Sequence, residues 1–166
     1  NTPRDYAGID PSYADVFEQF TPQRLFIASG SNIIDVHFVL PGTSTPGGTR
    51  GFGVVFSDVD LANTTTIEYF DHLGGSLGVF AAPETAGNET FSFLGVAWDA
   101  PLVRRARITT GNAALAPGVL DGGQTDVVAT DDFIYAEVSA VPEPGTWALL
   151  ATGLVALVGV RRRIRA

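Results

Sequence analysis

The stretch Gly51–Val59, which reads GFGVVFSDV, carries the strongest strand pattern in the chain. Phe52, Val54 and Phe56 fall on one face of an extended segment, because successive side chains of a strand point to opposite sides of its sheet. Val55 falls on the other face and is also apolar. The stretch therefore predicts a β-strand that is buried on both sides.

Other strand patterns lie on both sides of this stretch. Thr65–Phe70 and Ser76–Ala81 flank a Gly-rich turn and predict a hairpin. The alternation of apolar and polar residues in Ile33–Leu40 predicts a half-buried strand, with Ile34, Val36, Phe38 and Leu40 on the apolar face. The remaining predicted strands are Arg24–Ser29, Phe91–Trp98, Leu102–Thr109 and one or two strands within Asp126–Ser139.

Seven or eight short strands at roughly ten-residue spacing, with no amphipathic helix between them, favour an all-β fold. We expect residues 1–140 to form an antiparallel β-sandwich. Residues 1–23 are rich in turn residues and predict irregular structure with one short helical turn near Ala14–Gln19. The chain opens at Asn1 without a methionine or a visible signal peptide, so we expect a processed or N-terminally truncated chain.

Charge is divided unevenly along the chain. Residues 1–140 hold 17 acidic residues and six arginines, a net charge of −11, whereas residues 141–166 hold Glu143 and four arginines, a net charge of +3. The acidic body argues against nucleic acid as a partner, because phosphates would repel it. The absence of cysteine excludes disulfides and thiolate metal sites.

The last 26 residues, 141–166, read VPEPGTWALLATGLVALVGVRRRIRA. Residues 145–160 carry no charge and predict a single C-terminal hydrophobic helix, about 24 Å long, that crosses or nearly crosses a bilayer core of about 30 Å. Trp147 suits one membrane interface, and the arginines at the other end extend the reach of the helix and favour the cytoplasmic side; they are Arg161, Arg162, Arg163 and Arg165. The alternative is a buried helix of a soluble domain, which would show one polar face.

Three features of this tail occur in a characteristic order. They are the tripeptide Pro142, Glu143 and Pro144, the apolar span and the terminal arginine cluster. This arrangement resembles the PEP-CTERM sorting signal of bacterial exported proteins. The resemblance implies recognition and cleavage at the tripeptide by an exosortase-type transpeptidase, after membrane anchoring. It also implies delivery of the body to the cell surface or to an extracellular polysaccharide matrix.

The body, over residues 24–138, resembles jelly-roll domains that often accompany such signals, including carbohydrate-binding modules and lectin-like sandwiches. The segments that carry this resemblance are Gly51–Phe56, Thr66–Asp71, Phe93–Val96, Leu102–Thr109 and Asp131–Tyr135. The strand pair that such domains have at their N-terminus is not evident in this sequence.

Several aspartates lie near predicted strand ends. Asp58 and Asp60 follow the central strand, Asp131 and Asp132 begin the last one, and Asp121 and Asp126 lie in the loop before it. Ca²⁺ is bound by carboxylate and carbonyl oxygens on turns, and the jelly-roll resemblance implies an ion between the first and last strands. We therefore consider Asp58, Asp60, Asp131 and Asp132 as Ca²⁺ ligands. The alternative is that these aspartates cap turns by bonding their own backbone.

Two groups of residues are candidates for binding a ligand. Arg104, Arg105 and Arg107 could hold an anionic polysaccharide through forked hydrogen bonds, or they could pair with nearby acids on a solvated sheet face. Trp98 lies at a predicted strand end, where it could stack on a sugar ring or belong to the core.

The sequence contains no nucleophile elbow, and His37 and His72 have no evident nucleophile partner. We therefore expect a non-catalytic exported protein of the surface or matrix that needs no cofactor. The alternative is a carbohydrate-binding module for extracellular polysaccharide that uses Ca²⁺. A glycan hydrolase would require two carboxylates on either side of a cleft, and no such pair is marked.

Overall fold

The computed structural model describes residues 3–22, 24–141 and Thr152. Within them lie two helices of four residues each, the α-helix α1 (Pro3–Tyr6) and the 3₁₀-helix η1 (Pro11–Ala14). Seven strands follow, namely β1 (Ile33–His37), β2 (Gly51–Ser57), β3 (Thr66–Phe70), β4 (Ser76–Ala81), β5 (Phe91–Ala97), β6 (Arg105–Thr109) and β7 (Ala129–Tyr135). The prediction of an all-β body is confirmed. The C-terminal helix expected at 145–160 lies outside the described residues except for Thr152.

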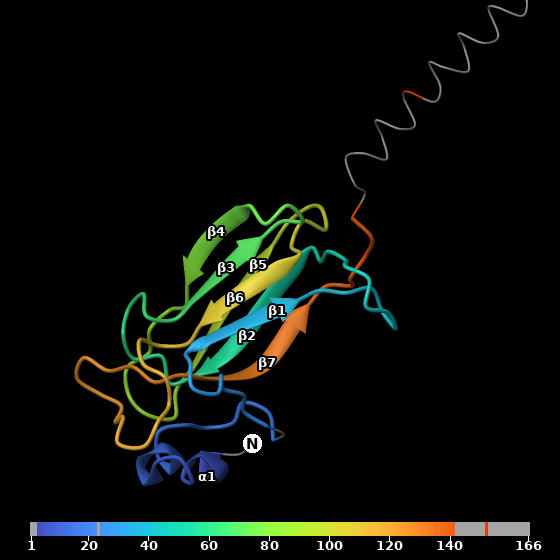
Figure 1. The fold of residues 1–166 in the computed structure, drawn as a ribbon. Coiled ribbons are helices and arrows are strands. Elements are labelled where there is room, and N and C mark those ends of the chain that lie inside the picture. Colours follow the sequence, from blue (N-terminus) through green and yellow to red (C-terminus); the bar gives the residue numbers. More distant parts are fainter. Residues whose placement is uncertain (1–2, 23, 142–151, 153–166) are drawn as a thin grey trace, which may run out of the picture.

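The strands form two sheets in which every neighbouring pair is antiparallel (Figure 1). One sheet has four strands in the order β1-β6-β3-β4, and the other has three in the order β5-β2-β7. The hairpin predicted from the Gly-rich turn is present as β3 and β4. Figure 1 shows α1 at one end of the strands, while the chain after β7 leaves at the opposite end.

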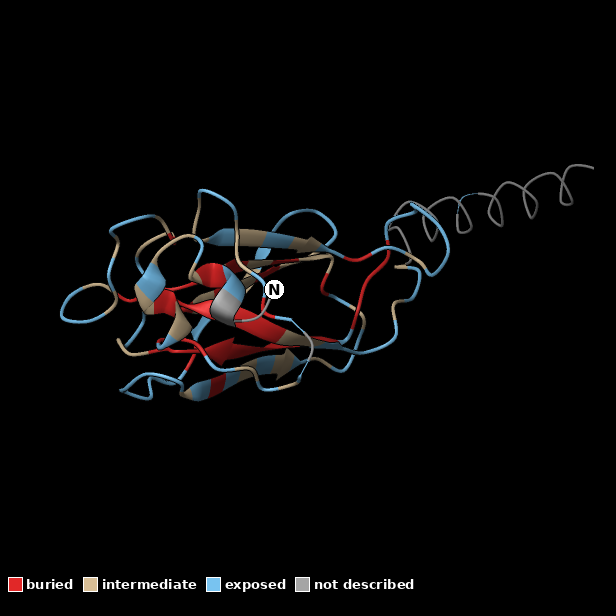
Figure 2. Ribbon diagram, turned by 90° about the horizontal axis from the view of Figure 1, so that it is seen from below, coloured by how far each residue is buried: buried red, intermediate tan, exposed pale blue. Residues whose placement is uncertain are grey.

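Strand β2 is buried over its whole length, as its sequence predicts. Its even-numbered side chains, Phe52, Val54 and Phe56, belong to a hydrophobic cluster that also includes Ile67, Tyr69, Ala106 and Ile108 of the four-stranded sheet. The hydroxyl of Tyr69 donates to the carbonyl oxygen of Phe52 over 2.9 Å, so the two sheets share a buried hydrogen bond as well as apolar contacts. Figure 2 shows the buried residues inside the molecule and the exposed ones mostly in the loops.

The N-terminal segment forms a second hydrophobic cluster with the loop before β7. Its buried members are Tyr6, Tyr13, Val16, Phe17, Leu25, Leu115, Val127 and Ala129. The Tyr13 hydroxyl donates to the carbonyl of Val119 over 2.6 Å, and the Ser57 hydroxyl accepts from the backbone N–H of Glu18 over 3.0 Å. These contacts hold the segment against the far end of β2.

Two predicted elements of this region are wrong in detail. Arg24–Ser29 does not form a strand; only Phe26 bridges to Thr130, with bonds of 2.7 and 2.9 Å. The helical turn expected near Ala14–Gln19 is placed earlier, at Pro11–Ala14. There Asp10 caps the turn by accepting from the Ser12 N–H, and proline occupies the first position, where its missing N–H costs nothing.

Two further boundaries moved. The strand predicted for Leu102–Thr109 begins only at Arg105, and a single strand, β7, forms within Asp126–Ser139. In the segment Leu102–Arg104, the one isolated bridge joins Val103 to Thr49.

The buried Tyr69 hydroxyl gives a test of the contact between the sheets. Tyr69→Phe keeps the ring but leaves a buried carbonyl without this donor, so we expect the free energy of unfolding to fall by about 1 kcal/mol. The measurement is the denaturant midpoint followed by circular dichroism. Tyr135→Phe is the matched control, because the Tyr135 side chain is 60% exposed. Equal midpoints for the two variants would contradict the assignment.

Candidate functional site

The chain leaves β2 at Asp58, in an unusual environment. The residue is fully buried, its backbone has a φ of +70°, and its N–H donates to the carbonyl of Thr90 over 3.0 Å. Neither carboxylate oxygen has a hydrogen-bond partner among the described residues. A buried carboxylate without a partner is costly, since almost all buried polar groups in folded proteins are paired.

Two further aspartates point to the same place. One oxygen each from Asp58, Asp60 and Asp121 lie within 4.8 Å of one another. Asp60 Oδ1 accepts from the Gly87 N–H over 2.8 Å, and Asp121 Oδ1 accepts from the Val127 N–H over 3.1 Å. A carboxylate offers about four lone-pair positions, so both side chains retain acceptor capacity. We call Asp58, Asp60 and Asp121 the aspartate cluster.

Asp126 joins the two loops that carry this cluster. Its Oδ1 accepts from the Asp60 N–H over 3.1 Å, and its Oδ2 accepts from the Thr64 hydroxyl. Its own N–H donates to Asn112 Oδ1 over 2.9 Å. The loop after β2 and the loop before β7 are therefore tied together beside the cluster.

Negative charge is concentrated at this cluster. Burial, and then the charges of Asp121, Asp60 and Asp126, raises the pKa of Asp58 to about 8. Burial also raises the pKa of Asp121 and that of Asp126. Both ion pairs found among the described residues belong to Asp35, so none reaches the cluster. The arrangement can bind a cation through oxygen atoms.

The predicted ligand set is only partly brought together. Asp58 and Asp60 belong to the cluster, whereas Asp131 and Asp132 are placed elsewhere, within β7. Asp131 Oδ2 accepts from the Phe20 N–H over 2.7 Å, and the Thr21 hydroxyl lies 3.2 Å from both Asp131 Oδ1 and Asp132 Oδ1. These two aspartates therefore anchor the N-terminal segment, and Asp121 takes the place that the sequence interpretation had given to them.

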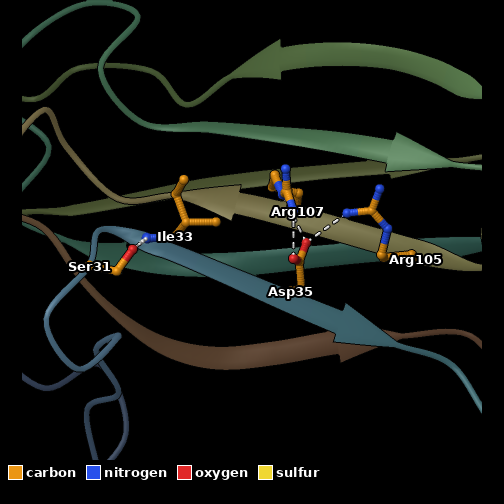
Figure 3. A network of polar contacts seen from close by, with 5 residues as sticks. All are labelled: Ser31, Ile33, Asp35, Arg105 and Arg107. Atoms are coloured by element: carbon orange, nitrogen blue, oxygen red, sulfur yellow. Dashed lines mark hydrogen bonds and ion pairs between the residues drawn. The ribbon is translucent and has the colours of Figure 1, made fainter.

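The arginines proposed as ligand-binding residues have partners within the fold. The carboxylate of Asp35 on β1 forms ion pairs with two arginines of the neighbouring strand β6 (Figure 3). Its oxygens lie 2.8 Å from a guanidinium nitrogen of Arg105 and 2.7 Å from one of Arg107. Arg105 also lies over the ring of Phe70, 3.6 Å from its centroid. Arg104 donates to the carbonyl of Phe38 over 2.7 Å. Arg105 and Arg107 therefore pair with a nearby acid on a sheet face, which is the alternative to ligand binding given in the sequence analysis.

Trp98 is half-buried and packs on the main hydrophobic cluster. Its ring meets that of Tyr69 edge to face, with centroids 5.0 Å apart. The contact accounts for the residue as part of the core.

Two hollows lie on the protein surface, one over the three-stranded sheet and one between β7 and the N-terminal segment. The first, of about 340 Å³, has glycines Gly51, Gly53 and Gly95 and the exposed side chains of Phe93 and Ile134 among its lining residues, none of which is charged. The second, of about 320 Å³, is lined by Thr21, Arg24, Phe26 and Asp132. Sequence reasoning did not find the second hollow, because its residues come from segments more than 100 positions apart.

Comparison with protein families identifies a motif at the C-terminus. Residues 140–163 match the family model of the PEP-CTERM protein-sorting motif. The C-terminus carries a PEP-CTERM sorting motif. The motif indicates export, anchoring in the membrane and exosortase-type processing there. No curated protein and no solved structure matches the chain.

The sorting residues lie outside the part of the chain that the structure describes. They are Pro142, Glu143, Pro144, Trp147, Arg161, Arg162, Arg163 and Arg165. Among residues 3–22 and 24–141 and at Thr152, no helix has the length and apolar character needed to cross a membrane.

The pairing of Asp35 with two arginines predicts a pH-dependent contribution to stability. Hydrogen bonds from Arg107, outweighing burial, lower the pKa of Asp35 to about 2. The contribution is therefore present above the unfolded pKa of about 3.9 and is lost as the pH falls through the folded value. Because the pair is partly exposed, we expect Asp35→Asn to lower the free energy of unfolding at pH 7 by only about 1 kcal/mol.

The measurement is urea unfolding of both proteins between pH 7 and pH 3. The difference between the wild type and Asp35→Asn should narrow below pH 4. A difference that stays constant down to pH 3 would show that the charge of Asp35 does not act through the arginines.

Proposed function

We propose that this chain is a non-catalytic exported protein whose all-β body is delivered to the cell surface or the extracellular matrix after exosortase-type processing. The sorting motif at residues 140–163 carries the proposal. Residues 145–160 act as a temporary transmembrane helix, and the arginine cluster stays in the cytoplasm while the acidic body lies outside. A span of about 24 Å is short for a bilayer, which suits an anchor that is removed.

The surroundings of the two histidines support a body without catalysis. His37 is exposed on β1 and His72 is exposed in the turn between β3 and β4. Asp71, the sequence neighbour of His72, accepts from the N–H groups of Leu73 and Gly75, both over 2.8 Å. This carboxylate therefore shapes the turn, which is a structural role.

We propose a jelly-roll-like sandwich as the arrangement of the body. A hydrophobic cluster with members from both sheets supports it, as does the way the chain passes back and forth between the two sheets, interrupted only by the β3–β4 hairpin. In this arrangement, the segment around Phe26 takes the position of an outer strand beside β7, reduced to a single bridge with Thr130.

The sorting motif gives a direct test. Glu143→Ala, in the tripeptide, should leave an uncut membrane-bound form, because a processing enzyme that reads the tripeptide loses its charged contact. Replacing the four terminal arginines with serine should release or misroute the precursor, since the positive flank no longer holds orientation. The measurement is an immunoblot of membrane and medium fractions in hosts with and without an exosortase.

The matched control is Glu137→Ala, which removes an exposed glutamate six residues upstream of Glu143. It should be processed like the wild type. A mature surface form that keeps its arginine tail, or identical processing in both hosts, would refute the proposal.

A second candidate function is the binding of extracellular polysaccharide by the body. The hollow lined by Thr21, Arg24, Phe26 and Asp132 favours it. Phe26 is 48% exposed and offers a ring face to a sugar, while Arg24 and Asp132 offer a donor and an acceptor for hydroxyl groups. Its volume of about 320 Å³ falls in the usual range of small-ligand pockets.

Arg24→Ala should lower binding to glycan-array ligands several-fold, because it removes the guanidinium donors from the hollow. Arg50→Ala is the matched control, since Arg50 is also exposed but does not line either hollow. Equal loss for both variants would indicate nonspecific charge effects. Unchanged binding by Arg24→Ala would rule out this hollow as the binding site.

A further inference from the structure

We infer that the aspartate cluster is a Ca²⁺ site, with Asp58, Asp60 and Asp121 as its carboxylate ligands. Asp58 follows β2 directly, and β2 ends at the side of the sheet where β7 begins, opposite the end at which the chain leaves β7 (Figure 1). The inference does not depend on the proposed function, since it rests on the geometry of the body alone.

Asp58 is the observation that points to an ion. On a protein surface, water screens the charges of neighbouring carboxylates, so an acidic cluster there needs no cation. Asp58 is instead fully buried, and both of its carboxylate oxygens lack hydrogen-bond partners among the described residues. One of these oxygens belongs to the group whose members lie within 4.8 Å of one another. The carboxylate therefore faces two other carboxylates instead of a donor, an arrangement that a cation would stabilise.

The protein supplies hydrogen-bond donors to the carboxylates around Asp58 and not to the carboxylate of Asp58 itself. The backbone N–H groups of Gly87 and Val127 bind Asp60 and Asp121, and the Thr64 hydroxyl binds Asp126. These bonds fix the orientation of the surrounding carboxylates, as hydrogen bonds to the ligands of a metal ion commonly do. The buried oxygens of Asp58 are left as the unsatisfied part of the site.

The donor atoms favour Ca²⁺ over other cations. All of them are oxygens, and both histidines lie elsewhere, on β1 and in the β3–β4 turn. The three oxygens lie within 4.8 Å of one another, close enough for one ion to reach them all. Ca²⁺ accepts six to eight oxygen ligands in a flexible geometry, whereas Mg²⁺ demands a near-ideal octahedron and keeps several waters, so carboxylates that come from two loops suit Ca²⁺ better.

Binding of the ion would join two distant parts of the chain. Asp58 and Asp60 follow β2, whereas Asp121 belongs to the loop between β6 and β7. That loop also supplies Leu115 and Val127 to the second hydrophobic cluster, which it shares with the N-terminal segment. A divalent ion would reduce the repulsion among the three carboxylates and hold both loops in place, so the body should be more stable with Ca²⁺.

The test uses the full chain in detergent and follows thermal unfolding by circular dichroism. CaCl₂ at about 10 mM, roughly ten times the dissociation constant of a weak extracellular site, should raise the melting temperature by about 4 °C over that in EDTA. MgCl₂ at the same concentration should have a smaller effect. Isothermal titration calorimetry with CaCl₂ measures binding directly and does not depend on stability.

Asp58→Asn keeps the shape of the side chain and removes its ability to carry the negative charge that a cation would bind. In EDTA the variant should melt at or above the wild-type temperature, because it no longer buries an ionisable group without a partner, and its calorimetric Ca²⁺ signal should be lost. Asp121→Asn should likewise lose the signal. Asp132→Asn is the matched control in β7 and should bind Ca²⁺ like the wild type.

The inference would be overturned by any of three results. One is a wild-type protein without a calorimetric Ca²⁺ signal. Another is an Asp58→Asn variant that binds Ca²⁺ with unchanged affinity. The third is loss of binding in Asp132→Asn while Asp121→Asn still binds.

Discussion

The burial of β2 on both faces is the constraint on which the rest of the body depends. Its even-numbered side chains must be covered by the four-stranded sheet, and Tyr69 completes that contact with a hydrogen bond to the Phe52 carbonyl. Its other face includes Val55 and Ser57, which are also buried. The N-terminal segment covers the Ser57 end, where the Glu18 N–H binds the serine hydroxyl.

The same burial explains the unusual chemistry at the end of the strand. A chain that leaves a central strand inside the protein carries its next residue into a poorly solvated position, and here that residue is an aspartate. The loop before β7, some 60 residues further along the chain, then brings Asp121 and Asp126 beside it. Low solvent access strengthens charge interactions of either sign. The carboxylates therefore repel one another more strongly than they would on a surface, and a bound cation would stabilise them more.

The two ends of the strands carry different parts of the chain. The aspartate cluster and the N-terminal helices lie at one end of the strands, and the chain after β7 leaves at the other (Figure 1). The acidic charge of the body and the arginines of the tail are likewise separated in the sequence. Export signals act through the tail, whereas the contacts that stabilise the body are made among residues far from it.

Local sequence determined the sorting motif and most of the strands. The PEP-CTERM motif consists of contiguous residues, so it can be recognised without knowing any tertiary contact. Strand β2 and the β3–β4 hairpin follow from side-chain alternation and turn residues within a few positions. Only the tertiary structure decided which aspartates meet, because Asp131 looks as suitable in sequence as Asp121. The N-terminal segment takes up Asp131, while loop closure presents Asp121 to the buried Asp58. Ligand grouping is a long-range property, and no local pattern encodes it.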